Sequence, residues 1–202
     1  KYLPGPWLVR RAIAAARERL AAHPIATVVM RRSHHIACLQ AFLKPVTDVG
    51  LVILLASSDP HSFVVVPHGG PAPRFSPNPI AAGIPTNGEP LLIDISTSST
   101  AHGNCLRTAA AGGRVGGQWL VDSNGNPTDD PPALHGGGIL PLGGMDLGYK
   151  GFGLALIVEA LTGALAGHGR PDGVKRWDAS VFLQLIDPEK FGGRAAFLRE
   201  MS

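Results

Sequence analysis

The chain has 202 residues and a formal net charge of +3; 45% of its residues are hydrophobic and only 16% are charged. This length allows one well-formed core or two small domains, and the low share of charged residues favours a compact protein or part of an oligomer. The N-terminal arginines follow helical spacing rather than a dense stripe with aromatic residues, which argues against a nucleic-acid-binding surface.

The first quarter of the chain predicts both helices and strands. Apolar residues at helical spacing predict an amphipathic helix over residues 9–22. The β-branched run over residues 25–30 predicts a buried strand, and residues 36–43 are expected to form a helix closed by Pro45. A second apolar run, residues 51–56, predicts another buried strand that ends in the polar sequence SSDP.

The middle of the chain predicts hairpins. Residues 64–70 are expected to be extended and to end in a turn. Residues 78–96 contain two predicted strands around the turn sequence Thr86-Asn87-Gly88, and Asn124-Gly125 marks a second hairpin of the same kind. Strands joined in this way pair in antiparallel fashion.

The last third of the chain predicts a long helix and a final strand. Residues 148–153, GYKGFG, are expected to form a glycine-rich loop that leads into an apolar helix over residues 152–167. This helix contains Glu159 and is shorter than the about 20 residues that a membrane span needs, so we expect a buried helix and no membrane association. Residues 179–187 predict the last strand.

Strands outnumber helices, and several strands are joined by hairpins. This pattern predicts an α/β (α+β) fold with a large mixed, mainly antiparallel sheet flanked by helices, rather than alternating βαβ units. No GxGxxG sequence opens a βαβ unit anywhere in the chain.

Two adjacent histidines, His34 and His35, follow the first predicted strand. Successive side chains diverge on a strand and on a helix, so only one of the two should face a given pocket. A histidine at such a place can exchange a proton with a carbonyl or alcohol oxygen, because its pKa is close to neutral. From the residues alone, a structural histidine held by hydrogen bonds is the favoured interpretation.

Three polar segments could line a ligand site. Ser57–Pro60 either forms a turn or is the polar lip of a ligand cleft. Asp94–Thr100 combines a carboxylate with five hydroxyl groups, which could hold ribose or phosphate oxygens but is also common in turns. Lys150 lies among glycines before a predicted helix N-terminus, where it could bind phosphate or carboxylate.

The two cysteines, Cys38 and Cys105, are too few and too far apart to predict a disulfide framework or a metal site. A reducing, cytoplasmic location is therefore the default expectation. We expect no metal, because the remaining histidines are isolated and no HExxH, HxH or CxxC sequence occurs. No GxSxG sequence supports a serine nucleophile.

Eight segments together resemble a known family, and they occur in its order: SHHIACLQAFL, LASSDP, VVPHGG, NPIAAGIPT, LLIDISTSS, WLVDSNGNPTDDP, LGYKGFGLAL and ASVFLQLIDP. With these segments the chain resembles the malate/L-lactate dehydrogenase family, whose relatives include ureidoglycolate dehydrogenase, sulfolactate dehydrogenase and the Δ1-piperideine-2-carboxylate reductases. The resemblance extends from about residue 3 to residue 193.

The resemblance implies a non-Rossmann NAD(P)-binding core, a homodimer, and NAD or NADP as the cofactor. The implied activity is hydride transfer between nicotinamide and a small 2-hydroxy or 2-oxo acid. A cyclic imino acid reductase is the alternative within the family, and a truncated, inactive cofactor-binding fragment is a further alternative. Neither the cofactor type nor the substrate is settled by the residues.

The resemblance also implies roles for particular residues. The family's His-x-Gly motif matches His35-Ile36-Ala37, which makes His35 the expected proton-exchanging residue or, by the cyclic imine branch, part of a cofactor segment over residues 35–39. His102 and Gly103 match residues that touch substrate. The other expected cofactor contacts are Ile36, Ala37, Cys38, Leu39, Ser58, Asp94, Ile95, Ser96 and Lys150.

The chain departs from the family pattern at three places. Ala37 replaces the usual glycine, His68 takes the place of an aromatic residue, and Asn104 stands where the imine branch has an aspartate. We also expect residues 1–202 to form a single cofactor-binding core that lacks the family's N-terminal Ser-His-Gly segment and its C-terminal segment.

Overall fold

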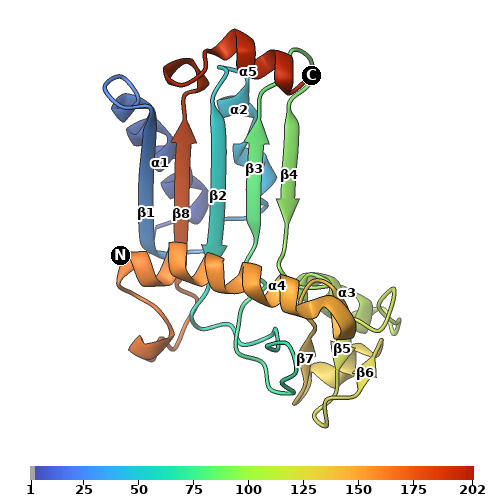
Figure 1. The fold of residues 1–202 in the computed structure, drawn as a ribbon. Coiled ribbons are helices and arrows are strands. Elements are labelled where there is room, and N and C mark those ends of the chain that lie inside the picture. The colour runs from blue at the N-terminus through green and yellow to red at the C-terminus, as the bar shows by residue number, and fades with distance from the viewer. Residues whose placement is uncertain (1–2) are drawn as a thin grey trace.

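A computed structural model describes residues 3–202 as a mixed α/β fold around a five-stranded sheet (Figure 1). Every neighbouring pair of strands is antiparallel, which confirms the predicted fold class. The last strand of the chain lies between the first two. The spatial order is β1 (Ile25–Ser33), β8 (Ala179–Ile186), β2 (Val52–Ser58), β3 (Ile80–Ile84) and β4 (Leu91–Ile95).

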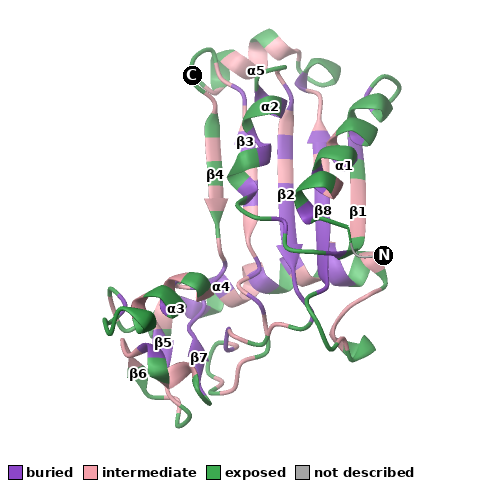
Figure 2. Ribbon diagram, turned by 180° about the vertical axis from the view of Figure 1, so that it is seen from behind, coloured by how far each residue is buried: buried purple, intermediate pink, exposed green. Residues whose placement is uncertain are grey.

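One face of the sheet carries the main core. Helices α1 (Gly5–Arg19) and α2 (Lys44–Thr47) and the 3₁₀ helix η1 (Leu39–Phe42) lie over it (Figures 1 and 2). Successive side chains on a strand alternate between faces, so one set from each central strand is fully buried against these helices. That set includes Ile53, Leu55, Leu183 and Leu185.

The opposite face is covered at one end only. Helix α4 (Gly144–Glu159) continues into a π-helical turn, η3 (Ala160–Ala164), and the two cross the ends of the strands where the chain leaves the sheet (Figure 1). Towards the other end, β4 exposes the side chains of Leu91 and Ile93 on this face.

A second, smaller sheet lies beside α4. It consists of β6 (Pro127–Thr128), β5 (Leu120–Val121) and β7 (Gly138–Ile139), flanked by α3 (His102–Ala110) and the 3₁₀ helix η2 (Pro131–Leu134). The hairpin predicted at Asn124-Gly125 joins β5 to β6 and is confirmed. The hairpin predicted at residues 86–88 likewise joins β3 to β4.

Two predicted elements are wrong. Residues 36–43 do not form one helix: the chain is irregular to Cys38, and Pro45 lies in the first turn of α2 instead of closing a helix. The expected glycine-rich loop over residues 148–153 is helical, because α4 already begins at Gly144. Position 151 still requires glycine, because a Cβ there would lie 2.4 Å from the backbone nitrogen of Leu142.

The remaining boundaries differ by a few residues. The first helix begins and ends before its predicted bounds of 9–22, and the predicted helix over residues 152–167 is divided between α4 and η3. Short elements complete the chain: η4 (Arg170–Asp172), η5 (Pro188–Lys190) and α5 (Arg194–Glu200). Within the described residues, no helix has the length and apolar character required to cross a membrane.

Candidate active site

A cavity of about 550 Å³ opens where β1, β2 and β8 meet the loops beyond their ends. This volume is in the range of small-molecule sites, about 300–1,000 Å³. The cavity brings together segments that are far apart in the sequence. The expected site residues in its lining are His35, Ile36, Ala37, Cys38, Leu39, Ser58, Asp94, Ser96, His102 and Gly103.

Two expected site residues do not line this cavity. Ile95 follows Asp94 on β4, so its side chain lies on the other face of the sheet, where it is exposed. Lys150 lies on α4, exposed, with its ammonium group 5.9 Å from the ring centre of Tyr149. The structure therefore places neither residue with the other candidates.

His35 presents its ring to the cavity just after β1 ends. Its Nδ1 accepts a hydrogen bond from the backbone N–H of Ala37 at 3.1 Å. A neutral ring that accepts at Nδ1 carries its proton on Nε2, so Nε2 is the atom that can donate to a ligand. The ring also packs edge-on against Trp177, with centroids 5.2 Å apart.

Of the two adjacent histidines, His35 lines the cavity and His34 does not, as expected from their alternating directions. The side chain of His34 is exposed. The backbone of both histidines packs closely against the first turn of α1. A Cβ on Gly5 would lie 2.4 Å from the carbonyl oxygen of His35, so only glycine allows the helix to approach this closely.

Ala37, which replaces the family's glycine, has φ of +65°. This left-handed conformation costs an alanine roughly 1–2 kcal/mol, whereas glycine adopts it freely at the expense of about 0.5–1 kcal/mol of chain entropy. We therefore expect Ala37→Gly to raise the free energy of unfolding by up to about 1 kcal/mol, measured by chemical denaturation. Ala15→Gly, at an exposed position of α1, is the matched control and should lower the free energy of unfolding by about 1 kcal/mol. Equal losses in both variants would contradict the strain at Ala37.

Asp94 fixes the loop that follows His35. Its Oδ2 accepts hydrogen bonds from the backbone N–H of Gln40 at 2.9 Å and from the thiol of Cys38 at 3.4 Å. This carboxylate therefore shapes the segment over residues 37–40 as well as lining the cavity.

The segment Ser57–Pro60 contributes a polar wall, in agreement with its interpretation as the lip of a cleft. Ser57, Ser58 and Asp59 all line the cavity and are buried. Asp59 Oδ1 accepts hydrogen bonds from the backbone N–H groups of His61 and Asp178, at 3.2 and 3.1 Å. One carboxylate thus joins the loop after β2 to the start of β8.

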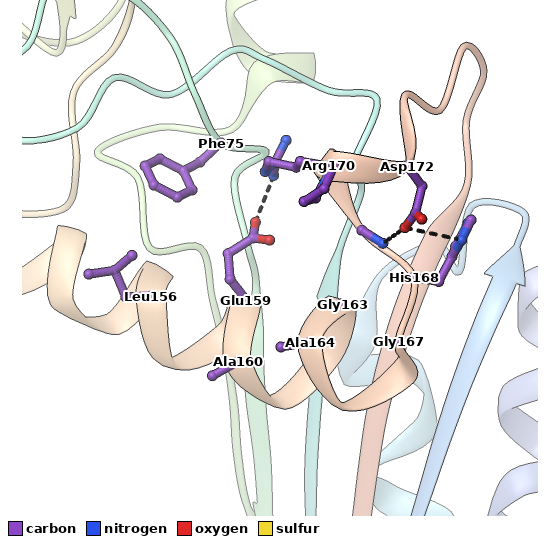
Figure 3. Close-up of a pocket in the computed structure, with 12 residues that line it drawn as sticks. Phe75, Leu156, Glu159, Ala160, Gly163, Ala164, Gly167, His168, Arg170 and Asp172 are labelled. Atoms are coloured by element: carbon purple, nitrogen blue, oxygen red, sulfur yellow. Dashed lines mark hydrogen bonds and ion pairs between the residues drawn. The ribbon is translucent and has the colours of Figure 1, made fainter.

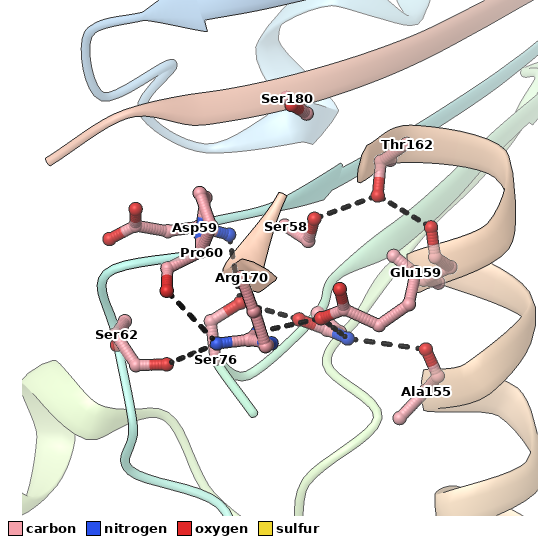
Figure 4. Close-up of polar contacts among 12 residues, drawn as sticks. Ser58, Asp59, Pro60, Ser62, Ser76, Ala155, Glu159, Thr162, Arg170 and Ser180 are labelled. Atoms are coloured by element: carbon pink, nitrogen blue, oxygen red, sulfur yellow. Dashed lines mark hydrogen bonds and ion pairs between the residues drawn. The ribbon is translucent and has the colours of Figure 1, made fainter. Parts of the chain in front are cut away.

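A hydrogen-bonded network behind this wall connects it to α4 (Figure 4). Arg170 donates to Glu159 Oε1 at 2.6 Å and to the carbonyl oxygens of Ser62 and Pro60 at 3.0 and 3.4 Å. Glu159 Oε1 also accepts from the amide of Asn78 at 2.9 Å. The network holds residues 60–62 and 76–78 against one end of α4.

The Arg170–Glu159 pair also forms part of the wall of a second cavity, of about 470 Å³ (Figure 3). Its lining is mostly apolar or glycine, as with Leu156, Ala160 and Gly163. His168, at its far side, bonds to Asp178 at 2.8 Å and lies 3.6 Å from Asp172. None of the residues expected to act on a ligand lies there.

His102 begins α3 and is half-buried at the cavity wall. Burial lowers the pKa of His102 below its usual 6.5, because it disfavours the charged imidazolium. At neutral pH this side chain is therefore an uncharged hydrogen-bonding group.

The lowered pKa of His102 predicts a pH-dependent contribution to stability. Between its folded pKa and 6.5 the unfolded chain binds more protons, so the free energy of unfolding rises with pH over this window. We expect stability to fall as the pH is lowered through the window, and to fall less in His102→Asn. Chemical denaturation at a series of pH values measures the difference, and parallel curves for the two proteins would contradict it.

Two lining residues had no signal in the sequence analysis. Trp177 lies in the loop before β8, and Ser76 lies before β3, where its hydroxyl accepts the backbone N–H of Asp59 at 3.0 Å. Neither belongs to a recognisable motif. Only the tertiary fold brings them to His35 and Asp59.

Comparisons with known proteins find relatives that match most of the chain. The family model described as malate/L-lactate dehydrogenase matches residues 1–202. The Δ1-pyrroline-2-carboxylate/Δ1-piperideine-2-carboxylate reductase of Pseudomonas putida is 37% identical over 197 residues, which are 90% of this chain and 56% of that protein. The (2R)-3-sulfolactate dehydrogenase (NADP(+)) of Chromohalobacter salexigens is 37% identical over 160 residues, covering 79% of this chain and 45% of that protein.

Among solved structures, a dehydrogenase from Sinorhizobium meliloti superposes with a TM-score of 0.83 at 31% identity, covering 94% of this chain and 56% of that one. The chain thus spans about half the length of the relatives that it matches. The family model covers every residue of the chain, and the fold and the order of motifs agree with it. The chain belongs to the malate/L-lactate dehydrogenase family.

Proposed function

We propose that this chain is the cofactor-binding core of an NAD(P)-dependent oxidoreductase that acts on a small 2-hydroxy or 2-oxo acid. The observation that carries the proposal is the convergence of His35, Ser58, Asp94 and His102 on one cavity. The family membership and the sulfolactate dehydrogenase among the relatives support the same reaction class.

The residues of the cavity fit a nicotinamide cofactor. The site offers a flat aromatic surface at Trp177, the hydroxyl-bearing Ser96, a wall that includes Ser58, and the backbone of residues 36–39. We propose that these groups hold NAD or NADP, and that His102 and Gly103 contact the substrate. When bound, the reduced cofactor supplies a hydride to C2 of the substrate.

His35 completes the reaction by moving a proton. As C2 is reduced, the carbonyl double bond breaks and negative charge develops on its oxygen. His35 donates the Nε2 proton to that oxygen as an imidazolium ion and is left as a neutral ring. The hydrogen bond that Nδ1 accepts from the backbone N–H of Ala37 belongs to the neutral ring and is lost when Nδ1 is protonated. A general acid placed in this way contributes about 10²–10⁴-fold to the rate.

A second candidate is the reduction of a cyclic imino acid, as in the Pseudomonas putida relative. The charged side chains that line the cavity, within the described residues, are Asp59 and Asp94, and no lysine or arginine lies among them. A protonated cyclic imine carries positive charge on its nitrogen, and these carboxylates favour it over a purely anionic substrate.

The test is to mix the protein with NADPH or NADH and panels of 2-oxo acids and cyclic imino acids, and to follow the absorbance of the reduced nicotinamide. Turnover of a 2-oxo acid supports the first candidate, and turnover of imino acids alone supports the second. Cofactor binding without turnover would support an inactive cofactor-binding fragment. Absence of any cofactor binding would exclude the proposed function.

We further propose that the protein forms a homodimer in the cytoplasm and that residues 1–202 act as one core. The uncovered apolar face of the sheet, with Ile25, Leu91 and Ile93 exposed, supports self-association. Cys38 is an exposed free thiol, as is usual in a reducing compartment. Sedimentation velocity measures the oligomeric state, and a monomer at micromolar concentration would contradict the dimer.

A further inference from the structure

The ring of His35 makes one hydrogen bond within the described residues, and this bond is lost in the charged form that acts as the acid. In it, Nδ1 accepts the backbone N–H of Ala37. When the ring is charged, Nδ1 carries a proton of its own and cannot accept. In the part of the chain that the structure describes, the ring has no hydrogen bond to the other titratable side chains of the cavity lining, which are Cys38, Asp59, Asp94 and His102. The charged ring therefore needs another contact to keep its orientation.

Trp177 makes a contact with His35 that does not depend on the protonation state. The two ring centroids are 5.2 Å apart and the ring planes meet at 63°, in the edge-to-face arrangement that aromatic rings prefer. This contact uses no lone pair of the imidazole, so it persists when Nδ1 is protonated. Trp177 also lines the cavity and is 41% exposed, so it is not a residue of the core.

The chain next to Trp177 is held by buried groups. Asp178, the following residue, donates its backbone N–H to Asp59 Oδ1 at 3.1 Å. The carboxylate of Asp178 bonds through Oδ2 to Nε2 of His168 at 2.8 Å. Both carboxylates are buried. The indole is thus attached to an anchored segment and is placed against His35 before any ligand binds.

We propose that Trp177 is a positioning residue that holds the charged ring of His35 with Nε2 towards the substrate oxygen. This inference rests on the proposed function. During the transfer the Nε2–H bond breaks and an O–H bond forms on the substrate, and the neutral ring then regains its bond to the N–H of Ala37. The indole orients the ring before the transfer, and the hydrogen bond orients it afterwards.

Steady-state kinetics test this role in turnover. Trp177→Leu removes the ring contact and should lower kcat by about 3–10-fold, which corresponds to the free energy of one aromatic contact. Trp177→Phe keeps an aromatic ring and should recover most of the loss. Trp7→Leu is the matched control and should leave kcat within about twofold, because Trp7 is 52% exposed on α1 and does not line the cavity.

A double variant separates the contact with His35 from a contact with the cofactor. A contact of the indole with the cofactor that is equal in the ground state and the transition state changes KM, whereas positioning of the acid changes kcat. In a His35→Ala background, Trp177→Leu should therefore have no further effect on kcat. Melting temperatures of the variants verify that the fold is retained.

Fluorescence tests the contact without any cofactor. A charged imidazole quenches the emission of an indole that it touches more strongly than a neutral imidazole does. On acidification over the range in which histidines titrate, about pH 8 to 5, the emission of the wild type should fall more than that of His35→Ala. In a Trp177→Phe background, His35→Ala should make no difference, because Trp7 and Trp119 are then the remaining tryptophans.

The inference is overturned if Trp177→Leu raises only KM, if its full loss in kcat persists without His35, or if the emission of the wild type and of His35→Ala falls to the same extent. Wild-type protein that binds neither NADPH nor NADH would overturn the proposed function together with this inference. Turnover that is unaffected by Trp177→Leu overturns the inference alone.

Discussion

Replacement of His35 by alanine is expected to lower kcat by at least about 10²-fold in catalytically active protein, because it removes the Nε2 proton donor from the cavity. Steady-state kinetics with NADPH or NADH and the best 2-oxo or imino acid substrate provide the measurement. The ring of His35 is exposed and its loss leaves the core intact, so the folded state should persist.

His34→Ala is the matched control. It removes the neighbouring imidazole, which is exposed and does not line the cavity, and it should leave kcat within about twofold. If His35→Ala raises only the KM for the reduced cofactor and leaves kcat unchanged, His35 is a cofactor contact and not the proton donor.

Replacement of Arg170 by alanine is expected to lower the free energy of unfolding by about 3 kcal/mol, since it leaves a largely buried Glu159 without its ion-pair partner. The same change removes the donors to the carbonyl oxygens of Pro60 and Ser62. It also removes a guanidinium that lies 5.2 and 5.6 Å from the ring centres of Phe63 and Phe75. Urea denaturation measures the loss.

Arg114→Ala provides the comparison for Arg170. Arg114 pairs with Asp129 on the surface, where its side chain is 63% exposed, and the loss of such a solvated pair should leave the free energy of unfolding nearly unchanged. Similar losses in both variants would show that the network of Arg170 contributes no more than a surface ion pair. Because Asp59 and Ser62 line the cavity, Arg170→Ala should also weaken cofactor binding.

The strands were predictable from the sequence because their signals are local. Residues 51–56 are an unbroken apolar run and residues 179–187 are largely apolar, and both became central strands buried on at least one face. The helix expected over residues 36–43 failed for a tertiary reason. Asp94, from β4, accepts the backbone N–H of Gln40 and holds the loop after His35 in a non-helical path. No pattern within the segment encodes that contact.

Most of the candidate cavity was predictable only through the family resemblance. Residues alone favoured structural interpretations of both His35 and Ser57–Pro60. Trp177 could not have been found, because its importance depends on the path of the chain near His35. The left-handed conformation at position 37 explains the glycine that the family pattern has there, and Ala37 adopts it with strain.

The π-helical turn at Ala160–Ala164 links the number of residues in this helix to its contact with β2. A π turn contains one residue more than the α turn it replaces, so deletion of a single residue there would restore regular α-helical bonding. The deletion would also rotate the following residues by about 100° around the helix axis. Thr162 would turn away from Ser58, and the buried hydrogen bond between the two hydroxyl groups would be lost. The number of residues in this segment therefore decides whether the helix and β2 are joined at this point.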